Sequence, residues 1–182
     1  MRITGGQLRS RALVAPKGQA TRPTSDRVRE ALFSMLVSDG VFAGDGPRVL
    51  DLYAGSGALA FEALSRGAQR AVLVEMARPA LAAIRENAST LDVRVEVLGL
   101  RVDRALANEA LGEFDLVLID PPYADVPTPA FAGILAAAAK VLAEEGILVL
   151  EHDASDDPEI PGLTVDRRRR HGDTTLSLFR RT

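Results

Sequence analysis

Short apolar segments alternate with longer amphipathic ones through most of the chain. The short segments, near 48–53, 70–75, 93–98, 114–120 and 145–151, have the length and the Val, Leu and Ile content of buried strands. The longer ones, near 58–66, 77–90, 102–110 and 128–143, have the apolar spacing of helices. Regular alternation predicts right-handed crossovers, and therefore an α/β fold: a mostly parallel sheet with helices on both faces.

The two ends of the chain break this alternation. Residues 1–23 are rich in Gly, Arg, Thr and Pro, which predicts a hairpin or an extended arm, and Ser25 then has the character of a helix N-cap. Near the other end, 163–169 and 174–179 are β-like runs joined by a turn, which predicts an antiparallel hairpin at the edge of a seven-stranded sheet. We expect two parts: a basic arm and helix in residues 1–40, and the sheet domain in residues 41–182.

Composition narrows the class of protein. The chain has 182 residues, of which 47% are hydrophobic, as expected of one globular domain. It has no cysteine, and its two histidines share no cluster with ligand spacing, so we expect no metal site. It has no run of 18 apolar residues and no signal-peptide pattern at its start, so we expect a cytoplasmic protein without a membrane partner. A monomer is the simplest expectation.

Charge is distributed unevenly along the chain. The formal net charge of −3 combines +6 in residues 1–29, −14 in residues 30–166 and +5 in residues 167–182. One arginine run is usually only a solvated face, but two basic ends on an acidic body favour contact with nucleic-acid phosphates. The arginines that we expect to make this contact are Arg9, Arg11, Arg22, Arg27, Arg29, Arg168 and Arg170.

The most informative motif is Asp120-Pro121-Pro122-Tyr123, which directly follows the apolar run 114–119. The prolines end the strand and stiffen the turn because they lack an N–H and have a fixed φ. Asp120 then lies at the carboxyl end of a strand, where α/β sheets bind their ligands. A carboxylate, two fixed carbonyls and a stacking ring suit the binding of a planar amino group, so we predict that these four residues are catalytic. The alternative is a structural turn whose tyrosine covers the core.

A second motif joins a predicted strand to a predicted helix at 48–60. Gly55 and Gly57 allow the backbone to approach a ligand, and the N–H groups that open the helix favour an anion. The next strand ends at Glu75, about 20 residues after the glycine loop, where an acid can bind the hydroxyls of an adenosine ribose. The alternatives are a plain strand-to-helix turn and a solvated acid. The expected cofactor-binding residues are Asp51, Tyr53, Ala54, Gly55, Ser56, Gly57, Glu75, Leu100 and Arg101.

These motifs together resemble the RsmD family of bacterial 16S rRNA (guanine-N2)-methyltransferases. The resemblance covers nearly the full length and is most specific in the Arg-Pro-Thr-x-Asp-Arg-Val-Arg-Glu stretch at 22–30, joined to the Asp-Pro-Pro-Tyr motif. It implies the class I methyltransferase fold, S-adenosylmethionine as the methyl donor, and 16S rRNA or the assembling 30S subunit as the partner. The sequence departs from the family pattern after the third predicted strand, where relatives often have an acidic residue near the adenine of the cofactor. There, either Asp103 is displaced or the backbone of Leu100 and Arg101 makes the contact.

The resemblance also implies a mechanism. The N2 lone pair of guanine is delocalised into the ring, so hydrogen bonds from its two N–H groups to the Asp120 carboxylate and the Pro121 carbonyl would localise it for methylation. Asp120 or water would then take the proton, and Tyr123 would stack on a base extruded from the RNA.

Four other readings stay open on the sequence. The same site could methylate adenine N6 or a protein glutamine, and the chain could be a non-catalytic RNA-binding assembly factor. A nicotinamide-dependent reductase is disfavoured because the third glycine of its fingerprint is absent, and because its sheet would continue with another crossover helix.

Overall fold

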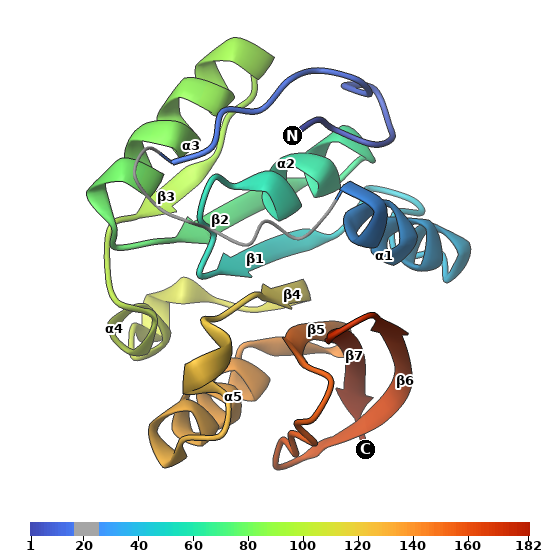
Figure 1. Ribbon diagram of the computed structural model, residues 1–182, viewed down its shortest axis with the longest axis vertical. Helices are drawn as coiled ribbons and strands as arrows, with labels where there is room; N and C mark the ends of the chain where they lie inside the picture. The colour runs from blue at the N-terminus through green and yellow to red at the C-terminus, as the bar shows by residue number, and fades with distance from the viewer. Residues whose placement is uncertain (17–25) are drawn as a thin grey trace.

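The computed structural model describes residues 1–16 and 26–182. Its centre is a seven-stranded sheet with the strand order β3-β2-β1-β4-β5-β7-β6 (Figure 1). The strands are β1 (Arg48–Leu52), β2 (Arg70–Val74), β3 (Glu96–Leu98), β4 (Phe114–Ile119), β5 (Leu142–Asp153), β6 (Leu163–His171) and β7 (Thr174–Arg181). The first five strands pair in parallel, whereas β7 is antiparallel to both β5 and β6. The predicted seven-stranded α/β sheet with a terminal hairpin is confirmed.

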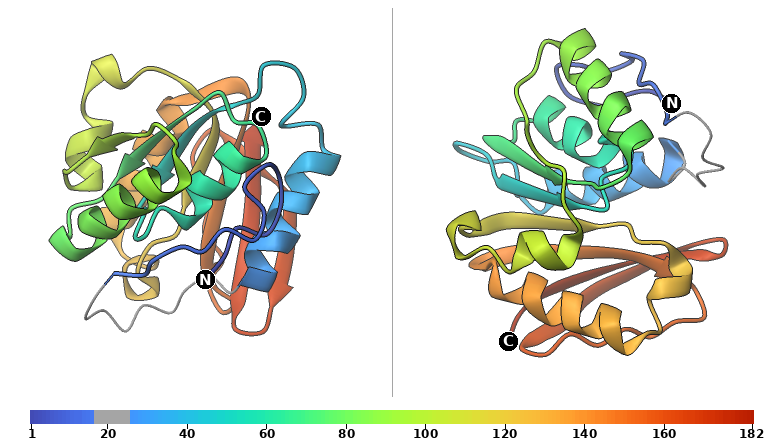
Figure 2. Two further views of the ribbon diagram at one scale, coloured as in Figure 1. Left: turned by 90° about the horizontal axis from the view of Figure 1, so that it is seen from above. Right: turned by 90° about the vertical axis from the view of Figure 1, so that its left-hand side faces the viewer.

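Helices cover both faces of the sheet (Figure 2). On one face lie α1 (Asp26–Ser38), α2 (Ala58–Ser65) and α3 (Arg78–Leu91), and on the other lie α4 (Val102–Leu106) and α5 (Pro129–Lys140). Two short 3₁₀ turns, η1 (Glu109–Leu111) and η2 (Tyr123–Asp125), flank β4. In the described residues, no helix has both the length and the apolar character that crossing a membrane requires.

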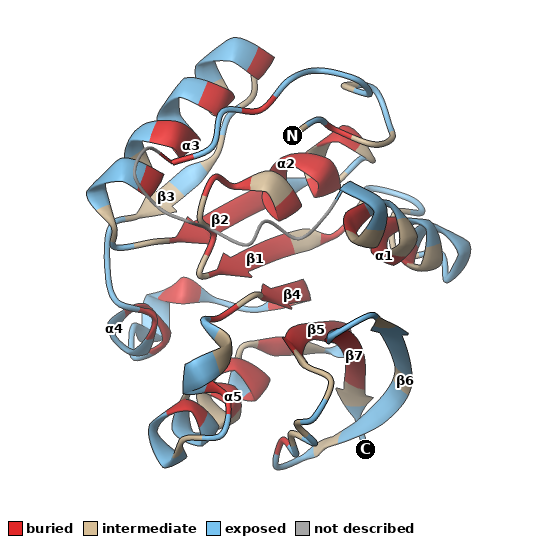
Figure 3. Ribbon diagram, viewed as in Figure 1, coloured by how far each residue is buried: buried red, intermediate tan, exposed pale blue. Residues whose placement is uncertain are grey.

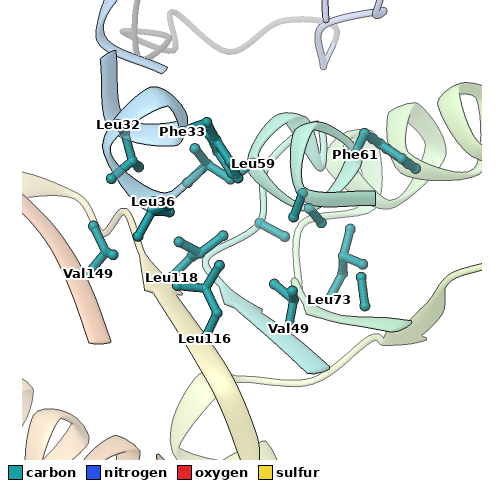
Figure 4. Close-up of a cluster of buried hydrophobic side chains, with 14 of the residues drawn as sticks. Leu32, Phe33, Leu36, Val49, Leu59, Phe61, Leu73, Leu116, Leu118 and Val149 are labelled. Atoms are coloured by element: carbon teal, nitrogen blue, oxygen red, sulfur yellow. The ribbon is translucent and has the colours of Figure 1, made fainter. Parts of the chain in front are cut away.

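The sheet separates two hydrophobic cores because successive side chains of a strand point to opposite faces. Val49 and Leu116 pack under α1 and α2 (Figure 4), whereas their neighbours Leu50 and Val117 pack against α4 and α5. The central strands β1 and β4 are buried except at Arg48 and Asp115, which are half-buried, and the burial colours show these strands as mostly buried (Figure 3). Each fully buried Leu or Val contributes about 1.5–3 kcal/mol of transfer free energy, so this double core holds the carboxyl ends of the strands in fixed register.

Four predicted boundaries are wrong, and one of them is the start of the strand predicted at 145, which begins at Leu142. The helix predicted at 102–110 is divided, since the Asn108 side chain accepts a hydrogen bond from the Ala110 N–H (3.1 Å) and starts a separate turn. The helix predicted to reach 143 stops at Lys140, because Leu142 already pairs with Phe114 as the first residue of β5. The third strand begins at Glu96 rather than at 93.

The amino-terminal arm is a hairpin, as predicted, and it packs on the helices. The Leu13 N–H donates to the Met1 carbonyl (3.0 Å), and Ile3 and Leu13 are buried in the same core as α1 and α2. Glu62 of α2, itself fully buried, accepts hydrogen bonds from the Thr4 and Gly5 N–H groups at 2.8 and 2.9 Å. The arm is therefore fastened to α2, the helix that follows the glycine loop.

Candidate active site

A pocket of about 820 Å³ opens at the carboxyl ends of the parallel strands. This is the edge of an α/β sheet at which ligands bind. The predicted catalytic and cofactor-binding residues that line it come from three places: Asp51, Tyr53, Ala54, Gly55 and Ser56 at the end of β1, Glu75 after β2, and Asp120, Pro121, Pro122 and Tyr123 after β4. Both motifs singled out in the sequence thus face one cavity.

The glycine loop turns the chain from β1 into α2 with an unusual backbone. Tyr53, Gly55 and Gly57 all have positive φ, of 61°, 57° and 79°. A Cβ on Gly57 would lie 2.6 Å from the Phe61 ring and 2.9 Å from Leu73, so no larger residue fits there. Gly57 does not line the pocket, in contrast to Gly55. Its part is to bring the chain sharply into the helix.

Glu75 is held by backbone donors on two sides. Its Oε2 accepts a hydrogen bond from the Gly55 N–H (2.9 Å), and its Oε1 accepts from the N–H groups of Met76 and Ala77, both at 2.8 Å. The carboxylate is half-buried and lines the pocket. Carboxylate oxygens accept more than one hydrogen bond each, so Glu75 can still receive ligand hydroxyls while it shapes the loop.

Asp51 is a buried acid at the bottom of the pocket. Its Oδ2 accepts a hydrogen bond from the Ala60 N–H (3.1 Å), while its Oδ1 has no partner among the described residues. Burial raises the pKa of Asp51 to about 8, and the nearby charges of Asp120 and Glu75 also raise it. A cationic group of a ligand would favour the ionised form of this acid.

Tyr123 lies beside Asp120 with its hydroxyl fixed. The hydroxyl donates to Glu151 Oε1 (2.9 Å) and lies 2.7 Å from Thr174 Oγ1. Burial raises the pKa of Tyr123, so its phenol is neutral. Glu151 was missed in the sequence, although it too is an acid at the end of an apolar run and lines the pocket. The ring of Tyr123 is thereby held near the carboxyl end of β5.

A smaller hollow of about 290 Å³ continues from the pocket past Glu75. The two share Tyr53, Glu75, Met76 and Asp125, and the smaller one is also lined by Leu100, Arg101 and Asp103. Arg101 pairs with Asp103 at 3.1 Å, and this contact lowers the pKa of that carboxyl. The two candidates for the adenine contact, the Asp103 side chain and the backbone of Leu100 and Arg101, therefore line the same hollow.

The predicted phosphate-binding arginines fall into different environments. The prediction that Arg29 contacts RNA at the surface is wrong, because its side chain is fully buried. There it pairs with Asp26 at 2.8 Å and with Glu62 at 3.3 Å. The exposed ones are Arg9, Arg11 and Arg27 at the amino-terminal end, and Arg168 and Arg170 on the edge strand β6. Arg22 lies outside the described residues, as does the proposed Ser25 cap.

Comparison with known proteins gives the family. The family model described as "Conserved hypothetical protein 95" matches residues 1–180. The chain belongs to this family. Among its relatives, "Putative rRNA methyltransferase YlbH" of Bacillus subtilis is 35% identical, over 100% of this chain and 99% of that protein. "Ribosomal RNA small subunit methyltransferase D" of Escherichia coli is 33% identical, over 100% of this chain and 90% of that protein. The resemblance drawn from the sequence motifs is confirmed.

Solved structures agree in fold as well as in sequence. "Putative methyltransferase yhhF from Escherichia coli" has a TM-score of 0.85 at 33% identity, covering 100% of this chain and 97% of that one. A Thermus thermophilus hypothetical protein, TTHA0928, has a TM-score of 0.81 at 33% identity, covering 98% of each chain. The sheet of the Conserved hypothetical protein 95 family is thus the class I methyltransferase sheet that the sequence predicted.

Proposed function

We propose that this protein transfers the methyl group of S-adenosylmethionine to the exocyclic N2 of a guanine in 16S ribosomal RNA. One observation supports the proposal above all. The Asp120-Pro121-Pro122-Tyr123 turn and the Glu75–glycine-loop unit line a single pocket. A planar amino group bound by the first would meet a methyl donor bound by the second. The named activities of the full-length relatives agree, since they are rRNA methyltransferases.

The residues of the pocket fit the methyl donor. The Glu75 carboxylate, oriented by three backbone N–H groups, suits the two hydroxyls of a ribose. Next to it, Met76 and Leu100 are 61% and 46% exposed, and they line the smaller hollow beside Tyr53. A hollow with exposed apolar walls suits an adenine ring, whose burial would cover them. When bound, S-adenosylmethionine supplies an electrophilic methyl group on a sulfonium.

Asp120 and the proline carbonyls would prepare the acceptor. The amino group of guanine has two N–H donors, and the Asp120 carboxylate and the Pro121 carbonyl are acceptors beside one another. Accepting both hydrogen bonds would draw the nitrogen lone pair out of conjugation. After methylation the nitrogen loses a proton, which Asp120 or water accepts. Holding the two reactants in one orientation supplies much of the rate.

Tyr123 would support the base. Its hydroxyl is bound to Glu151 and Thr174, so the ring is positioned before the substrate arrives. A base stacked on a fixed ring loses less entropy than one that must order the ring, and base–aromatic stacking contributes about 1–3 kcal/mol. The exposed arginines of the arm and of β6 would contact RNA phosphates.

A glutamine acceptor is the second candidate. "Release factor glutamine methyltransferase" of Chlorobaculum tepidum is 30% identical over 56% of this chain and 36% of that protein. A glutamine side chain also ends in a planar amide nitrogen, which the same turn could hold. The arginine-rich ends argue for the nucleic acid, because a neutral side chain gives them no partner.

One experiment separates these acceptors. The protein is incubated with S-adenosylmethionine carrying a tritiated methyl group and with 16S rRNA or 30S particles from cells lacking the modification. The RNA is then digested to nucleosides and analysed by mass spectrometry. Label in N2-methylguanosine is the expected result. Label in N6-methyladenosine, or in a protein in place of RNA, would overturn the guanine proposal, and label in no acceptor would favour the non-catalytic reading.

A further inference from the structure

Glu151 is a buried acid that lines the candidate active site and that the proposed mechanism does not use. It is 7% exposed and lies near the carboxyl end of β5. A carboxylate is costly to bury unless hydrogen-bond donors surround it. Tyr123 supplies one such donor, its hydroxyl, at 2.9 Å from Oε1. A carboxylate can accept about four hydrogen bonds, so Tyr123 can hold Glu151 in place while the acid receives a donor from a ligand.

Asp120 and Glu151 follow paired residues at the ends of neighbouring strands. Ile119 of β4 is in register with Leu150 of β5, and both pack in the core under α4 and α5. The residue after each of them is an acid, and the alternation of side chains directs both acids toward the opposite face of the sheet. Neighbouring strands are about 4.8 Å apart, and both acids line the pocket. A ligand with several adjacent N–H donors would therefore meet both acids at once.

The ring of Tyr123 relates Glu151 to the base. The phenol has one hydrogen, which it donates to Glu151, so Thr174 Oγ1 at 2.7 Å is the donor to the phenol oxygen. Glu151 therefore lies at the hydroxyl end of the ring as an acceptor. A base stacked on this ring would have Glu151 at its rim, next to Asp120.

We propose that Glu151 accepts a hydrogen bond from the N1–H of the target guanine, and that this contact makes the site select guanine. The inference rests on the proposed function, since the N2 amino group is then held by Asp120 and the Pro121 carbonyl. Guanine carries three N–H hydrogens on its neighbouring N1 and N2 positions. Acceptors of Glu151, Asp120 and Pro121 would match these three hydrogens one for one.

The other two acceptors considered above would meet Glu151 with the wrong group. Adenine has a lone pair and no hydrogen on N1, beside its N6 amino group, and a glutamine amide has a carbonyl oxygen beside its nitrogen. Either would place an acceptor against the buried carboxylate. A buried polar group left without its partner costs more than a missing hydrogen bond, so a site built to bind an N–H strongly rejects an analogue that lacks it. Glu151 would thus select the base, whereas Asp120 prepares its nitrogen.

The test uses RNAs that differ at N1 of the target base. The substrate is 16S rRNA, bare or assembled into 30S particles, ligated from two pieces so that the methylated position carries guanine or 2,6-diaminopurine. The second base keeps the 2-amino group but has a lone pair in place of N1–H. The wild type should show a kcat/KM about 10- to 100-fold higher on guanine, the range for a hydrogen bond to a charged group. Glu151→Gln should abolish or reverse this preference, because its amide oxygen can keep the Tyr123 contact while its NH₂ donates to the N1 lone pair. Thr174→Val is the matched control, since it removes the other partner of the same phenol and leaves Glu151, and it should keep the preference.

The outcomes are distinguishable. Equal kcat/KM of the wild type on the two RNAs would overturn the inference, even if no variant folds, and would leave the proposed function intact because guanine is still methylated. If Glu151→Gln lowers both rates and keeps the preference, Glu151 only holds the Tyr123 ring and the inference is wrong. It is also wrong if Thr174→Val loses the preference as fully as Glu151→Gln does, since the position of the ring then sets the selectivity. A wild type that methylates neither RNA would count against the proposed function, and the inference would fall with it.

Discussion

Replacing Glu75 tests the predicted cofactor site most directly. The Glu75 carboxylate already accepts hydrogen bonds from Gly55, Met76 and Ala77, all at 2.8–2.9 Å. A simple truncation to alanine would therefore release the glycine loop as well as the ribose. Glu75→Gln is the sharper change because its amide oxygen can keep some of these backbone bonds. It loses one acceptor oxygen and the negative charge.

The expected effect follows from the number of bonds lost. Hydrogen bonds to a charged group contribute about 1.5–3 kcal/mol, and one such loss weakens the Kd for S-adenosylmethionine by roughly 10- to 150-fold at 25 °C. Glu75→Ala should weaken the Kd at least as much. Glu86→Gln is the control, since Glu86 is exposed on α3 and its replacement changes the net charge equally. Calorimetry on that control should give the wild-type Kd.

A second ligand separates the ribose contact from the loop. A dideoxy form of S-adenosylhomocysteine lacks both ribose hydroxyls, and the wild type should bind it far more weakly than S-adenosylhomocysteine. Glu75→Ala should bind the two ligands alike, because the acceptor of the hydroxyls is gone; this comparison is a double-mutant cycle across the contact. If Glu75→Ala discriminates between the ligands as strongly as the wild type does, the ribose assignment is refuted.

Four other predictions follow from the site and its surroundings. Asp120→Ala should abolish methyl transfer to rRNA while the calorimetric Kd for the cofactor changes only a few-fold; near-normal turnover would defeat the acceptor model. Tyr123→Phe removes a partly buried hydroxyl that is hydrogen-bonded to Glu151 and Thr174, and it should lower the free energy of unfolding in urea by about 1 kcal/mol, with a smaller loss of turnover than Tyr123→Ala. Replacing both Arg168 and Arg170 by Gln should reduce the slope of log affinity for RNA against log salt concentration by the amount expected for up to about two phosphate contacts. An unchanged slope would exclude β6 as an RNA contact. Burial raises the pKa of Asp51 to about 8 in the folded chain, so between its ordinary pKa of 3.8 and about 8 the folded state holds a proton that the unfolded state has lost. The free energy of unfolding should therefore fall by about 1.4 kcal/mol for each unit that the pH rises in this range, and Asp51→Asn should remove this slope in urea titrations.

The sequence predicted those parts of the fold that depend on local periodicity. The strands β1, β2, β4 and β5 appear as apolar runs because their side chains are buried on both faces of the sheet, and the terminal hairpin appears because its turn residues are local. The boundary after α5 was wrong because it depends on a contact between segments far apart in the chain. Leu142 joins the sheet only because Phe114 lies beside it, and nothing near Leu142 in the sequence indicates this.

The candidate site could be predicted where function depends on the position of a residue at a strand end. Asp120 and Glu75 each follow an apolar run, and parallel strands bring such ends together. Glu151 also follows an apolar run, but its contact with Tyr123 depends on η2 folding back toward β5, and Thr174 joins them from the antiparallel β7. These are relations between segments far apart in the chain, and an isolated sequence does not contain them as a pattern.

Arg29 shows how a charge count can mislead where a periodicity would not. It was grouped with the basic amino-terminal residues by its charge, yet the buried positions of α1 are 29, 32, 33 and 36, a regular helical stripe that includes it. An arginine on the apolar stripe of a helix requires a buried acid, and α2 supplies one in Glu62, which also holds the arm. On the other side, the Asn87 side chain binds the backbone of Val14 in the arm and the Ser56 carbonyl in the glycine loop. The arm proposed to contact RNA and the loop proposed to hold the methyl donor are thus joined through one side chain in a single hydrogen-bonded unit.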